Sequence, residues 1–140
     1  MNVPQTHPSV EIVERFYATQ RRFYAGEDVT AELRAALADD VLWVVPGRST
    51  IAGEYRGPDQ VLAYFARRRD AADRTFRITP RGMLADAERV VHFADGEALI
   101  GGQRRQWRTV GLFTLAGGRI AECRLLPFDQ YEFDAIWGPA

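Results

Sequence analysis

The strongest constraint in this chain is a glycine pair that joins two alternating segments. Gly117 and Gly118 supply the two positive φ angles that a two-residue hairpin turn requires. On both sides of the pair, every second residue is apolar or uncharged. These residues are Trp107, Thr109, Gly111, Phe113, Leu115, Cys123, Leu125 and Pro127. The pattern predicts a hairpin over residues 108–129, with one face that the rest of the chain must cover.

The remaining segments predict helices first and strands afterwards. Spacings of three and four between apolar residues favour helices over 9–25, 30–38, 57–69 and 129–137. Strand patterns cover 41–45, 76–80 and 90–96, and a loop is expected over 48–55. The arginine run 67–69 is interpreted as a solvated helix end, and Asp129 as the cap of the last helix. The order predicts an α+β fold, in which three N-terminal helices pack on a strongly curved, mostly antiparallel sheet and form a cone.

Composition predicts one soluble globular domain over residues 1–140, with a loose N-terminal arm over 1–7. The chain is 46% hydrophobic and 26% charged, which is ordinary for a protein with a packed core. The formal net charge of −1 argues against a nucleic-acid binder, whose affinity depends on neutralising phosphates. No apolar run approaches the length of a membrane span, and no signal pattern opens the chain.

Several kinds of chemistry are not expected from this residue inventory. All 18 basic residues are arginines, so lysine nucleophiles and Schiff bases are absent. One cysteine cannot form an internal disulfide, which fits the cytoplasm. Two histidines and one cysteine without ligand-like spacing predict no metal site. The sequence also lacks the glycine-rich nucleotide-binding motifs and the GxSxG motif of hydrolases.

Three segments resemble the SnoaL-like branch of the nuclear transport factor 2-like superfamily. They read LADDVLWVVPG, IAGEYRGPDQVLAYF and LFTLAGGRIAECRLLPFDQYEFDAIW, and the resemblance extends from about Pro8 to Trp137. It implies a cone with an apolar pocket for small organic molecules, homodimers formed through the sheet, and no cofactor. Activities in the superfamily include ketosteroid isomerisation, polyketide cyclisation, dehydration and epoxide hydrolysis, and some members have no demonstrated catalysis.

Ketosteroid isomerases of this superfamily pair an aspartate base with a tyrosine and a protonated aspartic acid. The resemblance places Val45 at the position of the base and Gly111 at that of the protonated acid. The tyrosine position falls near Thr19 or Tyr17. Two of the three groups are therefore missing, and isomerisation by that mechanism is rejected. The aspartate and arginine network of limonene-type epoxide hydrolases is not matched either.

The pocket of such a cone would be lined by inward-facing residues of the predicted helices and strands. The residues predicted to bind substrate are Phe16, Trp43, Val45, Tyr55, Phe65, Phe93, Trp107, Thr109, Gly111, Phe113, Cys123 and Leu125. Large aromatic side chains suit either a pocket wall or ordinary core packing. Cys123 is interpreted as a small buried hydrophobe rather than a nucleophile, because the sequence places no histidine beside it.

The predicted catalytic residues are Asp95, Glu97 and Tyr17. If Phe93 faces inward, alternation carries Asp95 and Glu97 toward the cavity and turns His92 to the other sheet face. A carboxylate beside tryptophan would have a raised pKa and could act as a general base. The alternative is that residues 95–97 form a strand end or turn in water.

These observations support three functions. The first is a cofactor-independent cyclase, isomerase or lyase that acts on an apolar, carbonyl-containing, polyketide-like metabolite. The second is a carrier or binding protein for a hydrophobic metabolite, without catalysis. The third is a dimeric structural module. An inward carboxylate favours the first, a pocket without a titrating group favours the second, and a filled cone favours the third.

Overall fold

The computed structural model describes residues 7–139, so residues 1–6 of the predicted arm lie outside the description. The helices are α1 (Pro8–Tyr24), α2 (Thr30–Ala36), α3 (Gly57–Ala71) and α4 (Gln130–Trp137). The strands are β1 (Leu37–Val45), β2 (Gly53–Arg56), β3 (Arg77–Ala85), β4 (Arg89–Ile100), β5 (Gln103–Ala116) and β6 (Arg119–Pro127). His7 caps α1 by accepting a hydrogen bond from the Ser9 amide, and Asp129 caps α4 as predicted.

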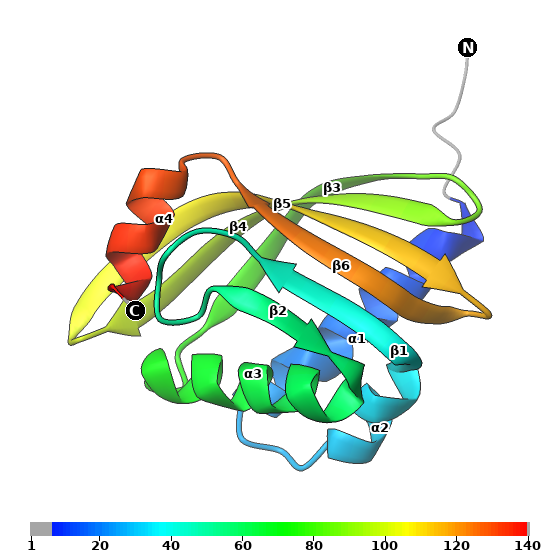
Figure 1. The fold of residues 1–140 in the computed structure, drawn as a ribbon, viewed down its shortest axis with the longest axis horizontal. Helices are drawn as coiled ribbons and strands as arrows, with labels where there is room; N and C mark the ends of the chain where they lie inside the picture. Colours follow the sequence, from blue (N-terminus) through cyan, green and yellow to red (C-terminus); the bar gives the residue numbers. More distant parts are fainter. Residues whose placement is uncertain (1–6, 140) are drawn as a thin grey trace.

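The six strands form one curved sheet in the order β2-β1-β6-β5-β4-β3. All neighbours are antiparallel except β1 and β6, which run parallel. Helices α1, α2 and α3 lie on the concave side of the sheet, and α4 lies across one end of it (Figure 1). The predicted α+β cone is confirmed. No helix within residues 7–139 is long and apolar enough to cross a membrane.

The hairpin of β5 and β6 forms around the glycine pair. Gly117 and Gly118 have φ angles of 59° and 76°, the left-handed values that a primed turn needs. Phe113 lies opposite Cys123, and both side chains are buried in the concave side of the sheet. The face that the sequence pattern selected is therefore the face that the helices cover.

Strand limits differ from the prediction at two places. Residues 53–56, expected to be loop, form β2 and pair with the end of β1. Strand β4 continues to Ile100 instead of stopping at Gly96, and the turn lies at residues 101 and 102. The alternative for residues 95–97 is therefore wrong about a strand end or turn, but it is right that Asp95 and Glu97 reach water. Each of these residues pairs with a residue of β5, and that pairing extends the strand.

The predicted orientation of β4 is wrong: the residues expected to face the interior lie on the outer face, and those expected outside lie inside. Residues directly opposite one another in an antiparallel pair share a face. His92 lies opposite Gly111 and Gly96 lies opposite Trp107, so His92 and Gly96 face the interior with the hairpin. Phe93, Asp95 and Glu97 alternate with them and lie on the outer face of the sheet. The indole of Trp107 occupies the space that a Cβ at residue 96 would need.

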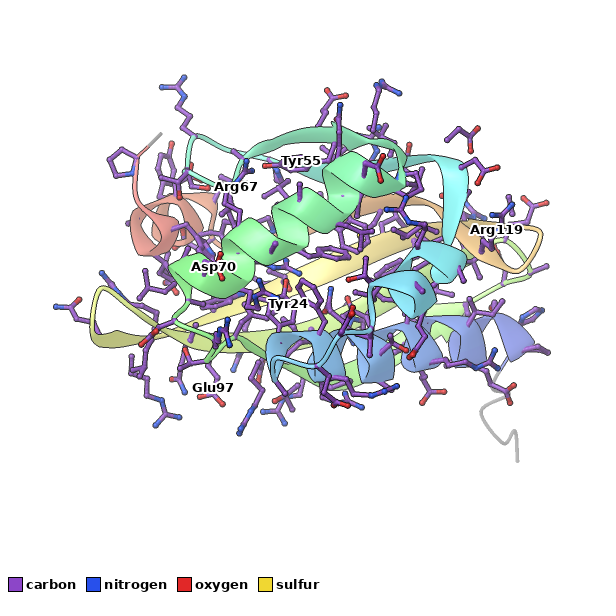
Figure 2. The ribbon with its side chains drawn as sticks, turned by 90° about the horizontal axis from the view of Figure 1, so that it is seen from below. Tyr24, Tyr55, Arg67, Asp70, Glu97 and Arg119 are labelled. Carbon is purple, nitrogen blue, oxygen red and sulfur yellow. The ribbon has the colours of Figure 1, made fainter. Side chains whose placement is uncertain are left out.

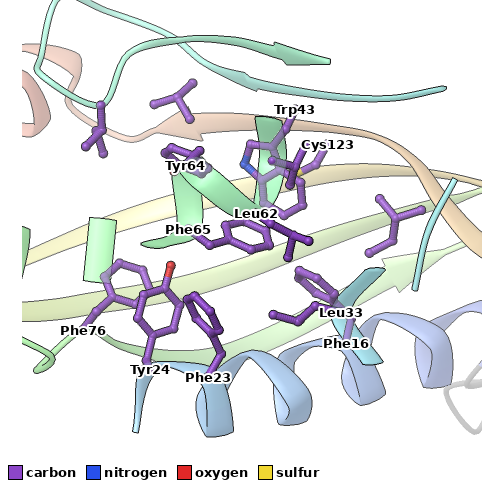
Figure 3. Close-up of a cluster of buried hydrophobic side chains, with 14 of the residues drawn as sticks. Phe16, Phe23, Tyr24, Leu33, Trp43, Leu62, Tyr64, Phe65, Phe76 and Cys123 are labelled. Atoms are coloured by element: carbon purple, nitrogen blue, oxygen red, sulfur yellow. The ribbon is translucent and has the colours of Figure 1, made fainter. Parts of the chain in front are cut away.

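The core lies between the concave face of the sheet and the helices α1 and α3. Figure 3 shows Phe16, Phe23 and Tyr24 rising from α1 toward Tyr64 and Phe65 of α3 and Trp43 of β1. Phe16 lies within 6.3 Å, between ring centroids, of Trp43, Phe65 and Phe113. Aromatic rings thus pack closely in the interior near β1, and a small cavity lies toward α4.

Candidate functional site

A small, partly enclosed cavity of about 20 Å³ lies between the sheet, the end of α3 and helix α4. Four of its walls are the rings of Phe76, Trp107, Phe133 and Trp137. Ile51, Ile78 and Leu125 add aliphatic surface, and the polar residues at the cavity are Arg68 and Thr109. A space of this size holds about one water molecule. Apolar walls with a few polar groups are typical of sites that bind small molecules.

Arg68 is the most unusual residue of this cavity. Its side chain is only 5% exposed, although arginine is almost never buried without a partner. It lies on α3 four residues after Tyr64 and seven after Val61, so the helical period places it on the buried face. The guanidinium lies 4.2 Å from the ring centroid of Phe76 and 4.9 Å from that of Tyr64. Aromatic rings therefore surround this charge.

The hydrogen-bond partners of Arg68 are two tyrosine hydroxyls. Nε donates to the Tyr24 oxygen and Nη1 to the Tyr64 oxygen, each at 2.8 Å. Tyr24 lies between α1 and α3 (Figure 2), and its hydroxyl points away from α1 (Figure 3). Among the described residues the ion pair of this helix end is made by Arg69 with Asp70, and none joins Arg68 to a carboxylate within 4 Å. Burial raises the pKa of Tyr24 and of Tyr64, so both hydroxyls are neutral at physiological pH.

A second polar group lies deeper in the cone, where His92 packs against Tyr17 of α1. The two ring centroids are 4.4 Å apart, and the His92 side chain is completely buried. Neither ring nitrogen has a hydrogen-bond partner among the described residues. Burial lowers the pKa of His92 to about 4, so the ring is neutral at physiological pH. Burial also raises the pKa of Tyr17.

Asp95 and Glu97 belong to a different feature, an open groove of about 470 Å³ on the outer face of the sheet. Asp95 accepts from Arg81 Nε at 2.7 Å, and Glu97 accepts from Arg104 Nη2 at 2.8 Å. Their side chains are 31% and 29% exposed. The prediction that they point into the cone is therefore wrong. Within the groove, three arginines face four acidic residues, and Asp95 and Glu97 are partly exposed and paired with arginines.

Residues 13–123 match the family profile of the SnoaL-like domain. The chain belongs to the SnoaL-like family. This SnoaL-like protein is 31% identical over 129 residues to uncharacterised proteins of Mycobacterium bovis and Mycobacterium tuberculosis, an alignment that covers 91% of this chain and 95% of each relative.

The solved structure of Bal32a, from a soil-derived mobile gene cassette, is similar to this SnoaL-like chain with a TM-score of 0.84 and 27% identity. That match covers 93% of this chain and 96% of Bal32a. A candidate SnoaL-like polyketide cyclase from Jannaschia sp. CCS1 matches with a TM-score of 0.77 at 20% identity, over 99% of this chain and 100% of the cyclase. The second likeness shows the shared fold.

Most of the predicted pocket residues lie inside this SnoaL-like cone. These are Phe16, Tyr17, Trp43, Val45, Phe65, Trp107, Thr109, Gly111, Phe113, Cys123 and Leu125. Of these, Trp107, Thr109 and Leu125 reach the cavity. Phe93 lies on the outer face instead, and Tyr55 stacks on Tyr64 at 4.5 Å without lining the cavity. Burial raises the pKa of Cys123, which makes its thiol a poor nucleophile.

Sequence reasoning missed Arg68, Tyr24 and the contribution of α4 to this SnoaL-like site. The signal for Arg68 was present, because residues 61, 64, 65 and 68 share one helical face. The run of three arginines concealed it. Arg67, the preceding residue, is exposed and donates to the Tyr55 hydroxyl, as the solvated interpretation requires. Only one arginine of the run turns inward.

Proposed function

We propose that this SnoaL-like chain acts as one domain that binds a small, largely apolar organic molecule in the cavity beside Arg68. The observation that carries the proposal is an aromatic cavity whose wall includes a buried, uncompensated guanidinium. Apolar walls supply affinity through burial, and a few fixed polar groups supply orientation.

A ligand larger than a water molecule must displace part of the wall, and α4 is the element placed to move. Phe133 and Trp137 of α4 close the cavity. The helix is held by hydrogen bonds to the loop between β1 and β2: Thr50 donates from its hydroxyl to the Trp137 carbonyl at 2.8 Å, and Gln130 donates to the Pro46 carbonyl at 3.3 Å. Binding would therefore shift α4 away from the sheet.

The first test compares two phenylalanine substitutions at neighbouring positions of β6. Leu125→Phe places a larger side chain in the cavity wall, whereas Leu126→Phe changes the opposite sheet face. We expect aromatic and aliphatic probe molecules to change the intensity or the emission wavelength of the tryptophan fluorescence in the wild-type protein, since Trp107 and Trp137 line the cavity. Leu125→Phe should weaken that binding about tenfold or more, as a blocked apolar contact would.

The control variant, Leu126→Phe, should bind the probes as the wild type does. Equal loss in both variants would locate the binding outside the cone. No change of tryptophan fluorescence in the wild type with any probe would contradict the proposed function itself.

Acid–base catalysis in the same interior is a second candidate, favoured by the buried pair of His92 and Tyr17. A neutral histidine can accept a proton from carbon beside a carbonyl group, and a tyrosine hydroxyl can donate to the resulting oxyanion. Such a protein would be a cofactor-independent isomerase, cyclase or lyase. Asp95 and Glu97 have no part in this proposal, because they lie on the other side of the sheet. NMR spectra of bound carbonyl compounds would separate the candidates: a carrier returns them unchanged.

We also propose a homodimer through the outer face of the sheet. Leu84 of β3, Leu126 of β6 and Phe128 after β6 are large apolar side chains exposed on or beside this face. A second copy would cover them and remove apolar surface from water. Leu126→Glu is expected to convert a dimer into a monomer in light scattering. Tyr131→Glu, at an exposed aromatic residue of α4, should leave the mass unchanged, and a monomeric wild type would refute the dimer.

A further inference from the structure

The charge of Arg68 has no counterion in the part of the chain that the structure describes. The guanidinium cannot lose its proton at physiological pH, so the charge is permanent. Tyr24 and Tyr64 accept two of its hydrogen bonds but are neutral. The faces of the Tyr64 and Phe76 rings compensate part of the solvation that the guanidinium loses on burial, but they carry no net negative charge. A buried charge of this kind is unfavourable unless an opposite charge joins it.

A second donor at the same cavity also lacks an acceptor. Trp137 lines the cavity, and its indole N–H is buried without a hydrogen-bond partner within residues 7–139. Buried donors are almost always paired in folded proteins, so the unpaired indole N–H of Trp137 beside the charge of Arg68 favours an acceptor supplied from outside the chain. The oxygen atoms of an anion would supply both a negative charge beside Arg68 and an acceptor for the indole N–H of Trp137.

The outer groove offers no comparable site for an anion. Arg81 and Arg104 each pair with a carboxylate there, at 2.7 and 2.8 Å. Counted over the whole groove, four acidic residues outnumber three arginines. Its arginines are exposed, so water and the paired carboxylates already satisfy them. Of these two sites, only the interior one carries a buried positive charge without a carboxylate partner among the described residues.

We propose that the cavity receives the carboxylate of a small organic acid, whose oxygens accept from Arg68 and from the Trp137 indole. The apolar body of the acid would lie against Phe76, Trp107 and Phe133, in space opened by α4. Tyr24 and Tyr64 hold the guanidinium in place from the other side and so act as positioning residues. This inference rests on the proposed function and adds the chemical class of the ligand.

The test uses pairs of probes that share a shape and differ in charge: benzoate with benzamide, and hexanoate with hexanamide. Binding to the wild-type protein is measured by calorimetry at neutral pH, where the acids are ionised. Each acid should bind about tenfold or more tightly than its amide, because hydrogen bonds to charged groups are about twice as strong as neutral ones. This comparison requires no variant.

Arg68→Met then removes the charge and keeps an unbranched apolar side chain. It should abolish the preference for acids and leave weak binding of both members of each pair. Arg67→Met, which changes the exposed neighbour, should keep the preference. If Arg68→Met fails to fold, the triple variant Arg68→Met, Tyr24→Phe, Tyr64→Phe replaces it. That variant leaves no tyrosine hydroxyl unpaired and should melt at or above the wild-type temperature.

The outcomes distinguish the two proposals. Acids and amides that bind equally, and lose binding together in Leu125→Phe, would overturn the carboxylate inference and leave the apolar site standing. A preference for acids that survives in Arg68→Met would also overturn it. No binding by any of the four probes would count against the proposed function and this inference alike.

Discussion

Gly96→Ala is expected to destabilise the protein by about 2 kcal/mol, the usual range for overpacking a tight interior. The added methyl group would point into the cone and meet the indole of Trp107, which lies against the Gly96 backbone. Relief requires Trp107 to move, and that movement disturbs its contacts with Phe133 and Trp137 at the cavity. Urea unfolding of the wild type and the variant measures the difference.

Asp95→Ala is the matched control, one residue away on the opposite face. It loses ion pairs with exposed arginines and should change stability by about 1 kcal/mol or less. In a double-mutant cycle, Gly96→Ala should cost less free energy of unfolding in a Trp107→Leu background, because leucine leaves room for the added methyl group. If Gly96→Ala is as mild as Asp95→Ala, the placement of Gly96 beneath Trp107 is wrong.

Acidification is expected to remove about 3 kcal/mol of folding free energy through His92 alone. The unfolded chain binds a proton at this residue below about pH 6.5, whereas the folded chain does so only below about pH 4. Between these values the unfolded state holds more protons, so stability falls as the pH falls. The contribution is fully present above pH 6.5, and the loss is complete near pH 4.

The measurement is the free energy of unfolding in urea at several pH values, for the wild type and for His92→Leu. Leucine cannot titrate, so the difference between the two proteins should change by about 1.4 kcal/mol per pH unit inside this window. Tyr17, the ring in contact with His92, has a raised pKa and stays neutral throughout the window. Parallel curves would mean that His92 is protonated in the folded protein or exposed to water.

The sequence predicted the fold because local signals and the core agreed. The glycine pair at 117 and 118 fixed the hairpin, and alternation around it selected the buried face correctly. Helix α1 combined an N-terminal proline with a regular apolar face, and it forms where expected. In these segments the local conformational preference of each residue agrees with its place in the core or at the surface, so the structure could be predicted from the sequence.

The orientation of β4 could not be predicted because both of its faces carry apolar residues. Val91 and Phe93 suggested one face, while the buried face actually holds His92, Ala94 and Gly96. Glycine is required at residue 96 because the indole of Trp107, on the neighbouring strand, fills the space of a Cβ there. The size of a partner on another strand is not visible in the alternation of one segment. Because the face was misassigned, Asp95 and Glu97 were predicted to be interior catalysts.

Arg68 escaped prediction for a related reason. A charged side chain on the buried face of a helix contradicts the expectation that arginines are solvated, and the preceding residue, Arg67, does obey that expectation. The partners that make its burial tolerable, Tyr24 and Phe76, come from α1 and from the segment before β3. Only the assembled fold brings these residues together. The sequence therefore predicted the cone but not the site around Arg68.

The most direct test of the central claim is a high-resolution crystal structure of the wild-type protein grown with benzoate. We expect the carboxylate inside the cone, within hydrogen-bond distance of Arg68 and of the Trp137 indole, with α4 displaced from its position here. Benzoate bound only in the outer groove at Arg81 or Arg104, with the interior cavity unchanged, would contradict the account.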